Sequence, residues 1–539
     1  MKKYLIVLII ATIFTSCNQL NDTERTLLNN ATAVVQLENS KLLASVVADS
    51  LEVPWDILIG PDNWLWYTEQ KGSISRVHLT TGKKQLLKQI EEVHYKKSRG
   101  LLSMTLHPQF KEYPFVFVHY NYSYQDDNLK EIIKSRVVRF TFAKDTLTDP
   151  LVVLDKIPGK TYHNGSRMLI SPDQKLFFAF GDAGEATSAQ DPGVLNGKIM
   201  RINLDGSIPA DNPIPNSPVW SWGHRNVQGV VWANGKLYAS EHGTSKDDEI
   251  NIIIKGGNYG WNRVEGFCDL PREQAYCQDS TIIEPLKSWT PTLGIAGLGY
   301  YNNDAIPEWQ NSLVSVNLKG RALRILSLDE SGEHITGEKI YFQKRFGRLR
   351  DVAVGLNGDL FFSTSNTDWH PRYQPWMYDA LPGGGDRIIR LSPMSAQFLA
   401  SIDPELPRLQ QDSTPIELAA ENWHVETTDD ETALGERLYL AHCAACHRPD
   451  GTGAEGLIPT LVGTDWVTGD KSRLINIMLY GLSEPIEVNG MTYEQEMPAY
   501  NILEDDQIAA IINYIRNNFG NEAGNVSIAE ISEERRQKS

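Results

Sequence analysis

The stretch SWGHRNVQGVVWANGKLYASEHGTSKDDEINIIIKGGNYGW, residues 221–261, holds the pattern that decides the fold. Its phrase ANGKLY at 233–238 places a turn before a β-rich run, and EINI at 249–252 belongs to a second alternating run. Asn and Gly favour turns, whereas aromatic and β-branched residues favour strands. Polar groups gather between the runs, and loops at strand ends are where such groups converge on a ligand. The alternative to a ligand site is that these loops are ordinary connecting turns whose charged side chains are solvated.

The same phrase recurs along the chain as a turn, a β-rich run, a loop and a second alternating run. The six copies lie within residues 60–77, 107–140, 171–202, 233–252, 311–325 and 356–391. Radially arranged sheets of four short strands leave only short, protected edges, and repeats at about this spacing are typical of propeller blades. The repeats therefore predict a mainly β chain with a six-bladed propeller over residues 42–393. A large β-sandwich is the alternative.

The pattern changes after the repeats. Residues 394–426 are rich in Pro, Gln, Asp and Ser and predict a linker. From residue 427 the apolar spacing becomes helical, most clearly in the isoleucines of 505–519. We therefore expect a small all-α domain over residues 427–520 and a charged, frayed tail over 521–539.

Charge excludes one class of partner. The chain has 539 residues, with 68 Asp and Glu against 51 Lys and Arg, and a net charge of −17. Nucleic acid binding needs a basic face toward the phosphates, so no nucleic-acid partner is expected. An apolar content of 41% is typical of a soluble globular protein, and the length predicts more than one domain.

The first residues resemble an export signal. Two lysines precede an apolar run at residues 4–14 that is too short to span a bilayer comfortably, and small residues follow. The sequence FTSC ending at Cys17 resembles a bacterial lipoprotein cleavage box. This resemblance implies a signal peptide over 1–17, a lipidated Cys17, a polar tether over 18–41 and a membrane anchor in the bacterial cell envelope, on the periplasmic side or the cell surface. The alternative is an ordinary signal peptide with an incidental cysteine.

The cysteines divide by position. Of the five, Cys268 and Cys277 lie nine positions apart in one expected loop. Export places the chain in an oxidising compartment, so we predict that these two form a disulfide. Cys443 and Cys446 have a different use.

The sequence CAACH, residues 443–447, is the attachment signal for c-type haem. Its spacing lets the thiols of Cys443 and Cys446 bond the two vinyl groups of haem c while His447 becomes an axial ligand of the iron. A redox dithiol or half of a zinc site is the alternative, but a second cysteine pair for zinc is missing. Met497 in EMPAY resembles the distal Met-Pro ligand segment of small class I cytochromes c, with Met491 and Met478 as competitors.

Five segments are rich in charged or polar residues: YHNGSR (162–167), GHRN (223–226), SEHGTSKDDE (240–249), NLKG (317–320) and RLRD (348–351). Together they resemble the soluble PQQ-dependent sugar dehydrogenases, which act on glucose, other aldoses or sorbosone. This resemblance implies a pyrroloquinoline quinone (PQQ) pocket, a catalytic base and a calcium ion. The residues it implies are His163 as the base, Arg225 as both catalytic and PQQ-binding, Asn226, Asp248, Thr292, Lys319, Arg348 and Arg350 for PQQ, and the carbonyls of Gly243 and Thr244 for Ca²⁺.

Elementary chemistry agrees with this interpretation. PQQ carries three carboxylates and needs cations in an otherwise acidic protein. Arg348 and Arg350 are two positions apart on an expected strand, so both side chains point to one face. Arginine offers a planar fork to a carboxylate, and Lys319 adds a compact charge. The alternative is surface ion pairing.

The resemblance implies a function as well. A neutral His163 would take the proton of a sugar hydroxyl, while calcium and Arg225 would stabilise the charge that develops on the quinone oxygens. Electrons would pass to the haem and on to a respiratory acceptor. The alternative functions are a non-catalytic carbohydrate- or protein-binding propeller joined to an electron-carrying cytochrome c, and a haem-only oxidoreductase with a sugar-recognition propeller.

Three positions depart from the glucose-oxidising members of that family. Tyr162 stands where they have Asp, Ser98 or Arg99 where they have Gln or Glu, and His242 where Gln is common. These departures leave the cofactor segments largely intact, but they do not predict glucose as the substrate.

Overall fold

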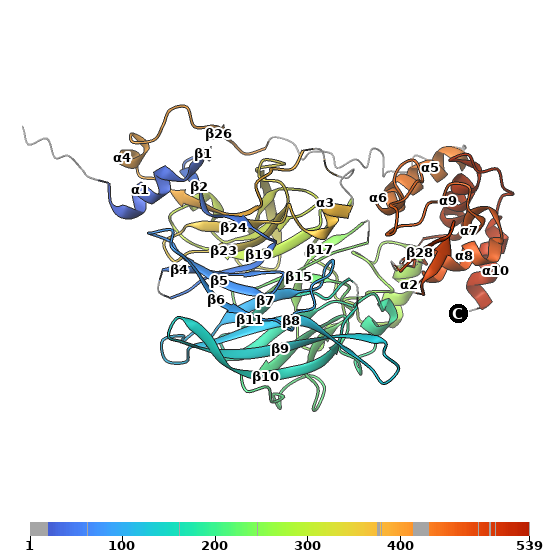
Figure 1. Cartoon of the computed structure of the whole chain (residues 1–539), viewed down its shortest axis with the longest axis horizontal. Helices are drawn as coiled ribbons and strands as arrows, with labels where there is room; N and C mark the ends of the chain where they lie inside the picture. The colour runs from blue at the N-terminus through green and yellow to red at the C-terminus, as the bar shows by residue number, and fades with distance from the viewer. Residues whose placement is uncertain are drawn as a thin grey trace, which may run out of the picture.

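The computed structural model describes residues 20–537 except 62, 161, 245, 374–377, 379, 413–430, 483, 495, 496, 498 and 502. Six sheets are arranged around a common axis, and a helical domain lies against one side of them (Figure 1). The predicted six-bladed propeller is thereby confirmed. The signal peptide, Cys17 and the part of the expected linker from residue 413 onward lie outside the described residues.

Five blades are four-stranded antiparallel sheets built from consecutive segments. Their strands are β3 (Pro54–Ile59), β4 (Trp64–Glu69), β5 (Ser73–His78) and β6 (Lys84–Gln89); β7 (Leu101–Leu106), β8 (Phe115–Gln125), β9 (Glu131–Ala143) and β10 (Thr146–Pro158); β11 (Met168–Ile170), β12 (Lys175–Phe180), β13 (Lys198–Asn203) and β14 (Val219–Trp222); β15 (Val227–Ala233), β16 (Lys236–Glu241), β17 (Asp248–Ile253) and β18 (Lys287–Trp289); and β19 (Ile295–Tyr301), β20 (Ser312–Asn317), β21 (Leu323–Leu328) and β22 (Ile335–Tyr341).

The sixth blade closes the ring by joining distant parts of the chain. Its strands β23 (Leu349–Val354), β24 (Leu360–Thr364) and β25 (Asp386–Pro393) pair onward with β2 (Lys41–Leu51) from the N-terminal part. The innermost strands contact one another around the ring in the order β3, β7, β11, β15, β19, β23 and β3 again. Loops at the end of these inner strands therefore face a common mouth.

The segment expected to be a tether is ordered instead. Helix α1 (Asp22–Asn29) is capped at its N-terminus by Asn21, whose side chain forms a capping box with that of Glu24. Strand β1 (Ala31–Gln36) extends the sixth blade, pairing with β2 and, in parallel, with β26 (Arg408–Leu409) of the expected linker. The structure differs from the expectation because a few apolar side chains, Leu27 and Val34 among them, are buried with Leu43.

The helical domain packs around one apolar core. Helices α5 (Glu431–His442) and α9 (Asp505–Asn517) cross where Gly435 approaches Ala510, and a Cβ on Gly435 would lie 2.4 Å from the carbonyl oxygen of Ala510. The remaining elements are α6 (Ala444–His447), α7 (Asp465–Thr468), α8 (Lys471–Tyr480) and the hairpin of β27 (Ile486–Val488) and β28 (Met491–Tyr493). Residues 521–539 were expected to be a frayed tail, but they contain helix α10 (Ile528–Gln537), which buries Ile531 in this core.

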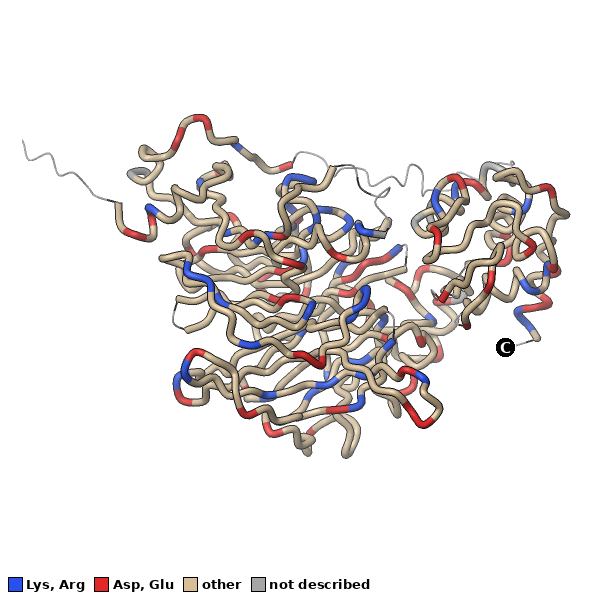
Figure 2. The backbone as a smooth tube through the Cα atoms, in the orientation of Figure 1, with Lys and Arg blue, Asp and Glu red and all other residues tan. Residues whose placement is uncertain are grey.

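Short helices decorate the propeller loops. They are η1 (Ala186–Gln190), α2 (Pro271–Asp279), η2 (Pro307–Trp309), α3 (Trp369–Tyr373) and α4 (Ala396–Leu399). The predicted disulfide between Cys268 and Cys277 is present and closes the loop that carries α2. Figure 2 shows acidic and basic residues interspersed over both domains. Within the described residues, no helix has the length and apolar character needed to cross a membrane.

Candidate functional site

A cavity of about 320 Å³ lies at the mouth of the propeller. It brings together all ten residues that the sequence assigned to the quinone and calcium sites. They are His163, Arg225, Asn226, Gly243, Thr244, Asp248, Thr292, Lys319, Arg348 and Arg350. They come from segments up to 187 positions apart, so their convergence is a property of the fold and not of local spacing.

The imidazole of His163 is held in one orientation. Its Nδ1 lies 2.8 Å from Oδ1 of Asp182, and the second oxygen of Asp182 accepts a 2.8 Å hydrogen bond from Nε1 of Trp261. A carboxylate at Nδ1 favours the tautomer with its proton there, which leaves Nε2 free to accept one. His163 also has a φ of 55°, a sparsely populated conformation that is common at functional sites.

The pKa of His163 is lowered from its ordinary value. Burial is the main cause and the nearby charge of Arg225 adds to it, while Asp182 opposes the shift. His163 is therefore neutral at pH 7, which is the state that a general base needs.

Arg225 reaches the cavity from the loop before β15. Its Nη1 donates to the carbonyl of His242 at 3.3 Å, and its guanidinium lies 5.4 Å from the ring centre of Trp261. Its Nε is buried and has no hydrogen-bond partner within the described residues, and the same holds for Nε2 of His242. Buried polar atoms without partners are uncommon in folded proteins, so these two atoms indicate a polar ligand in the cavity.

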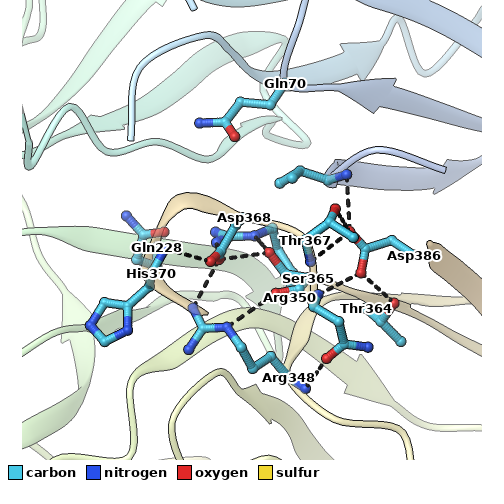
Figure 3. A network of polar contacts seen from close by, with 12 residues as sticks. Gln70, Gln228, Arg348, Arg350, Thr364, Ser365, Thr367, Asp368, His370 and Asp386 are labelled. Atoms are coloured by element: carbon cyan, nitrogen blue, oxygen red, sulfur yellow. Dashed lines mark hydrogen bonds and ion pairs between the residues drawn. The ribbon is translucent and has the colours of Figure 1, made fainter. Parts of the chain in front are cut away.

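Arg348 and Arg350 share one counter-ion. Each is 3% exposed, and each Nη2 donates to Oδ2 of Asp368, at 2.8 and 2.9 Å. Figure 3 shows the two guanidinium groups converging on this carboxylate. Both arginines hold the pKa of Asp368 down to about 2, despite its burial. Burial lowers the pKa of Arg350 to about 10. The pair is thus buried, unlike surface ion pairs, and its two guanidinium groups share one ion-pair partner.

Lys319 completes the cationic side of the cavity. Its Nζ lies 3.4 Å from Oγ1 of Thr292, and burial lowers its pKa while Asp248 opposes the shift. Among the described lining residues, four Arg or Lys side chains face two Asp carboxylates. In a protein with a net charge of −17, such a surplus fits a ligand that carries several negative charges.

The carboxylate of Asp248 accepts hydrogen bonds from main-chain amides of the protein. Its Oδ1 accepts a hydrogen bond from the amide of Gly243 at 2.9 Å, and its Oδ2 accepts from the amides of Leu293 and Ile295 at 2.8 and 3.0 Å. Burial raises the pKa of Asp248 to about 6. The structure therefore places this carboxylate in the cavity wall as a brace between two loops, where its oxygens point to main-chain donors.

The main chain at Gly243 and Thr244 has an arrangement that fits a cation. The amide and hydroxyl of Thr244 both donate to Glu265, and the hydroxyl distance is 2.9 Å. In the part of the chain that the structure describes, neither carbonyl oxygen of Gly243 and Thr244 accepts a hydrogen bond. Carbonyl oxygens are ligands that calcium takes. The described residues contain no cluster of three or more His, Cys, Asp or Glu side chains with metal-site geometry.

A second cavity, of about 330 Å³, is lined mainly by the helical domain and on one side by residues of the propeller. Cys443, Cys446, His447 and Met497 line it together with apolar residues of α8 and α9. Cys443 and Cys446 are not joined in a disulfide. Nδ1 of His447 lies 3.0 Å from the carbonyl of Pro459, which leaves Nε2 for a metal, and burial lowers its pKa to about 4. These residues fit a haem c.

The three methionines that are candidates for the sixth iron ligand differ in their positions relative to the haem cavity. Met497 lines the haem cavity and is fixed by two main-chain hydrogen bonds with Leu482, at 2.8 and 2.9 Å. Met478 also lines this cavity. The sulfur of Met491 accepts a hydrogen bond from the amide of Gly456 at 3.1 Å and is not part of the lining. Met497 and Met478 thus remain as candidate iron ligands.

Comparisons with known proteins assign a family to each of the two domains. The model of a family described as Glucose / Sorbosone dehydrogenase matches residues 51–370, which is more than half of the chain. The chain belongs to the glucose/sorbosone dehydrogenase family. A cytochrome c family model matches residues 432–519, so this dehydrogenase carries a C-terminal cytochrome c domain.

Three relatives illustrate the match. Quinoprotein glucose dehydrogenase B of Acinetobacter calcoaceticus is 36% identical over 407 residues, covering 60% of this chain and 85% of that protein. The PQQ-bound aldose sugar dehydrogenase of Streptomyces coelicolor superposes with a TM-score of 0.55 and 29% identity, over 66% of this chain and 99% of that one. Cytochrome c-552 of Thermus thermophilus is 39% identical over 92 residues, covering 16% of this chain and 70% of that cytochrome.

Several residues of the dehydrogenase site were not found from its sequence. Asp182, Trp261, Asp368 and Glu265 orient His163, Arg348, Arg350 and Thr244 from loops that carry no recognisable spacing. One signal was available: Gly-Asp at 181–182 directly follows an apolar run, as a residue at a strand end would. Tyr378 is a further case, since its hydroxyl contacts both Arg348 and His370.

Proposed function

We propose that this protein is a PQQ-dependent dehydrogenase that oxidises an aldose, or a related sugar or alcohol, and passes the electrons to its own haem c. The observation that carries the proposal is the position of the His163–Asp182 pair beside a surplus of buried cations, in a cavity that adjoins the haem cavity. Bound PQQ would supply the two-electron acceptor for the sugar.

The chain's residues have distinct tasks in this proposal. Arg225, Asn226, Thr292, Lys319, Arg348 and Arg350 would bind the quinone carboxylates and oxygens. Asp248 holds the loops that carry Gly243 and Thr292, through the amides of Gly243, Leu293 and Ile295. The carbonyls of Gly243 and Thr244 would hold Ca²⁺, which would supply positive charge in the cavity. His163 accepts the hydroxyl proton of the sugar at Nε2, and Asp182 stabilises the imidazolium that results. Arg225 adds positive charge where negative charge develops.

In the cytochrome domain, Cys443 and Cys446 would bond haem c, and His447 and Met497 would ligate its iron. A thioether ligand raises the haem potential, which suits an electron acceptor. From there the electrons would pass to a respiratory acceptor.

The proposed location is the bacterial cell envelope, with a lipid on Cys17. Replacing Cys17 with Ser should release the protein from the membrane fraction. Membrane association that persists in C17S would contradict the anchor.

Reconstitution tests the enzymatic proposal. The purified full-length protein with haem attached is incubated with PQQ and Ca²⁺. It is then mixed with a panel of aldoses and alcohols while haem absorbance is recorded. Haem reduction that requires both PQQ and a sugar is the expected result. Reduction by sugar without PQQ, or no reduction with any substrate, would overturn it and favour a binding propeller joined to an electron carrier.

A further inference from the structure

The propeller does not close the quinone cavity by itself. Three residues of the cytochrome domain also line it: His442 at the end of α5, and Ala499 and Tyr500 in the segment before α9. Figure 1 shows this domain beside the part of the propeller where α2 and α3 lie. The chamber is therefore built from both domains.

Tyr500 belongs to the wall that separates the two cavities. Among the described residues, the linings of the quinone and haem cavities share Tyr162, His163, Arg225, Trp369, His370 and Tyr500. Five of these come from the propeller, and Tyr500 is the contribution of the cytochrome domain. Because His163 is part of the same wall, a hydroxyl that reaches the base lies close to the Tyr500 side.

The side chain of Tyr500 is held in place from its own domain. Its hydroxyl donates to the carbonyl of His442 at 2.9 Å, and its amide donates to the carbonyl of Met478 at 2.7 Å. The rings of His442 and Tyr500 meet edge to face with centres 6.1 Å apart. These contacts fix Tyr500 in the wall between the two cavities.

The available space limits what can enter. A cavity of about 320 Å³ is near the lower end of the usual range for ligand sites, roughly 300–1,000 Å³, and it must hold both the quinone and the substrate. A sugar held at His163 would have the cytochrome domain on one side, because Tyr500 shares a wall with His163 and His442 lines the same cavity. No comparable wall would exist if the cytochrome domain were placed elsewhere.

We propose that the sugar site of this dehydrogenase is a composite of both domains, in which Tyr500 restricts the substrate to a single sugar ring. This inference rests on the proposed function. Tyr500 is a specificity-determining residue here, and it also closes the chamber over bound PQQ.

The test compares Y500A with Y500F, which keeps the ring but loses the hydroxyl, and with the matched control Y480A. Tyr480 lies on α8 of the same domain, is 37% exposed and lines neither cavity. For each protein, kcat/KM is measured with an aldose and with its linear trisaccharide. The dissociation rate of PQQ is measured without substrate, by the recovery of tryptophan fluorescence, since Trp55 and Trp369 line the cavity.

We expect Y500A to lower the preference for the single ring by about tenfold or more, the scale on which small changes of pocket shape act. PQQ dissociation should become about tenfold faster, and Y500F and Y480A should resemble the wild type in both measurements. Equal behaviour of Y500A and Y480A, with intact haem spectra, would overturn the inference. Failure of the wild type to bind PQQ or to oxidise any sugar would instead overturn the proposed function, and the inference with it.

Discussion

Oδ1 of Asp182 lies 2.8 Å from Nδ1 of His163, and this contact fixes which nitrogen of the imidazole faces the cavity. The carboxylate is 1% exposed and is held in turn by Trp261 and by the amide of Gly184. A histidine arranged in this way can accept a proton at Nε2 without first losing one.

Replacing either member of this pair should slow turnover. We expect H163A to lower kcat by about 10²–10⁴-fold, the usual contribution of a general base, with haem content unchanged. D182N should also lower kcat, because the amide can hold the wrong tautomer. Steady-state kinetics with the reconstituted enzyme measures both. Normal turnover in H163A would remove this residue from its role.

The pH profile should follow the protonation of His163. Its pKa is lowered by burial and by Arg225, so the base is neutral at pH 7, and activity should fall only below pH 6.5 as it becomes protonated. Because Asp182 opposes that lowering, D182N should move the acid limb of kcat/KM further toward low pH. An acid limb that shifts upward in D182N would contradict this assignment.

Arg348 should contribute to PQQ affinity directly. A hydrogen bond to a charged group contributes about 1.5–3 kcal/mol, so R348A should weaken PQQ binding by about 10–100-fold in equilibrium titration. The matched control is R390A, because Arg390 is another buried arginine, paired with Asp359, outside the cavity lining. R390A should destabilise the blade and leave PQQ affinity unchanged. Equal PQQ affinity in R348A and R390A would show that Arg348 does not bind the quinone.

The methionine variants should identify the sixth iron ligand. M497A should lose the sulfur-to-iron charge-transfer band and lower the haem potential, since thioether ligation raises that potential. M478A and M491A should keep the band. If M478A loses it and M497A does not, the ligand assignment moves to Met478.

Helix crossing in the cytochrome domain should depend on Gly435. A Cβ at this position would lie 2.4 Å from the carbonyl oxygen of Ala510, so G435A should destabilise the domain by about 1–3 kcal/mol. The control is G524A, where an added Cβ meets nothing within 4 Å. Thermal unfolding followed by haem absorbance should separate the two variants, and equal midpoints would contradict the close crossing.

Local patterns explain what the sequence could predict. Blade repeats, the CAACH spacing and the segments around His163 and Arg348 are each complete within a few residues, so the propeller, the haem attachment and the cavity residues could be anticipated. The residues that contact and orient these cavity residues could not be anticipated. Asp182 and Trp261 are 79 positions apart and meet only because two blades are adjacent.

The predictions of a tether at the N-terminus and a frayed tail at the C-terminus were wrong for a related reason. The helices α1 and α10 depend on few buried side chains, chiefly Leu27 and Ile531, within otherwise polar sequence. Tertiary packing stabilises these helices although their apolar periodicity is weak, and a sequence pattern alone does not show that packing. The approach of Tyr500 to the quinone cavity is likewise a relation between domains.

Anaerobic stopped-flow mixing tests the central claim most directly. The PQQ- and Ca²⁺-loaded protein is mixed with an aldose, and haem reduction is followed at several protein concentrations. Sugar oxidation that feeds the haem of the same chain predicts a first-order rate constant that does not depend on protein concentration and that is about 10²–10⁴-fold lower in H163A. A rate that rises with protein concentration, or that is unchanged in H163A, would contradict the account.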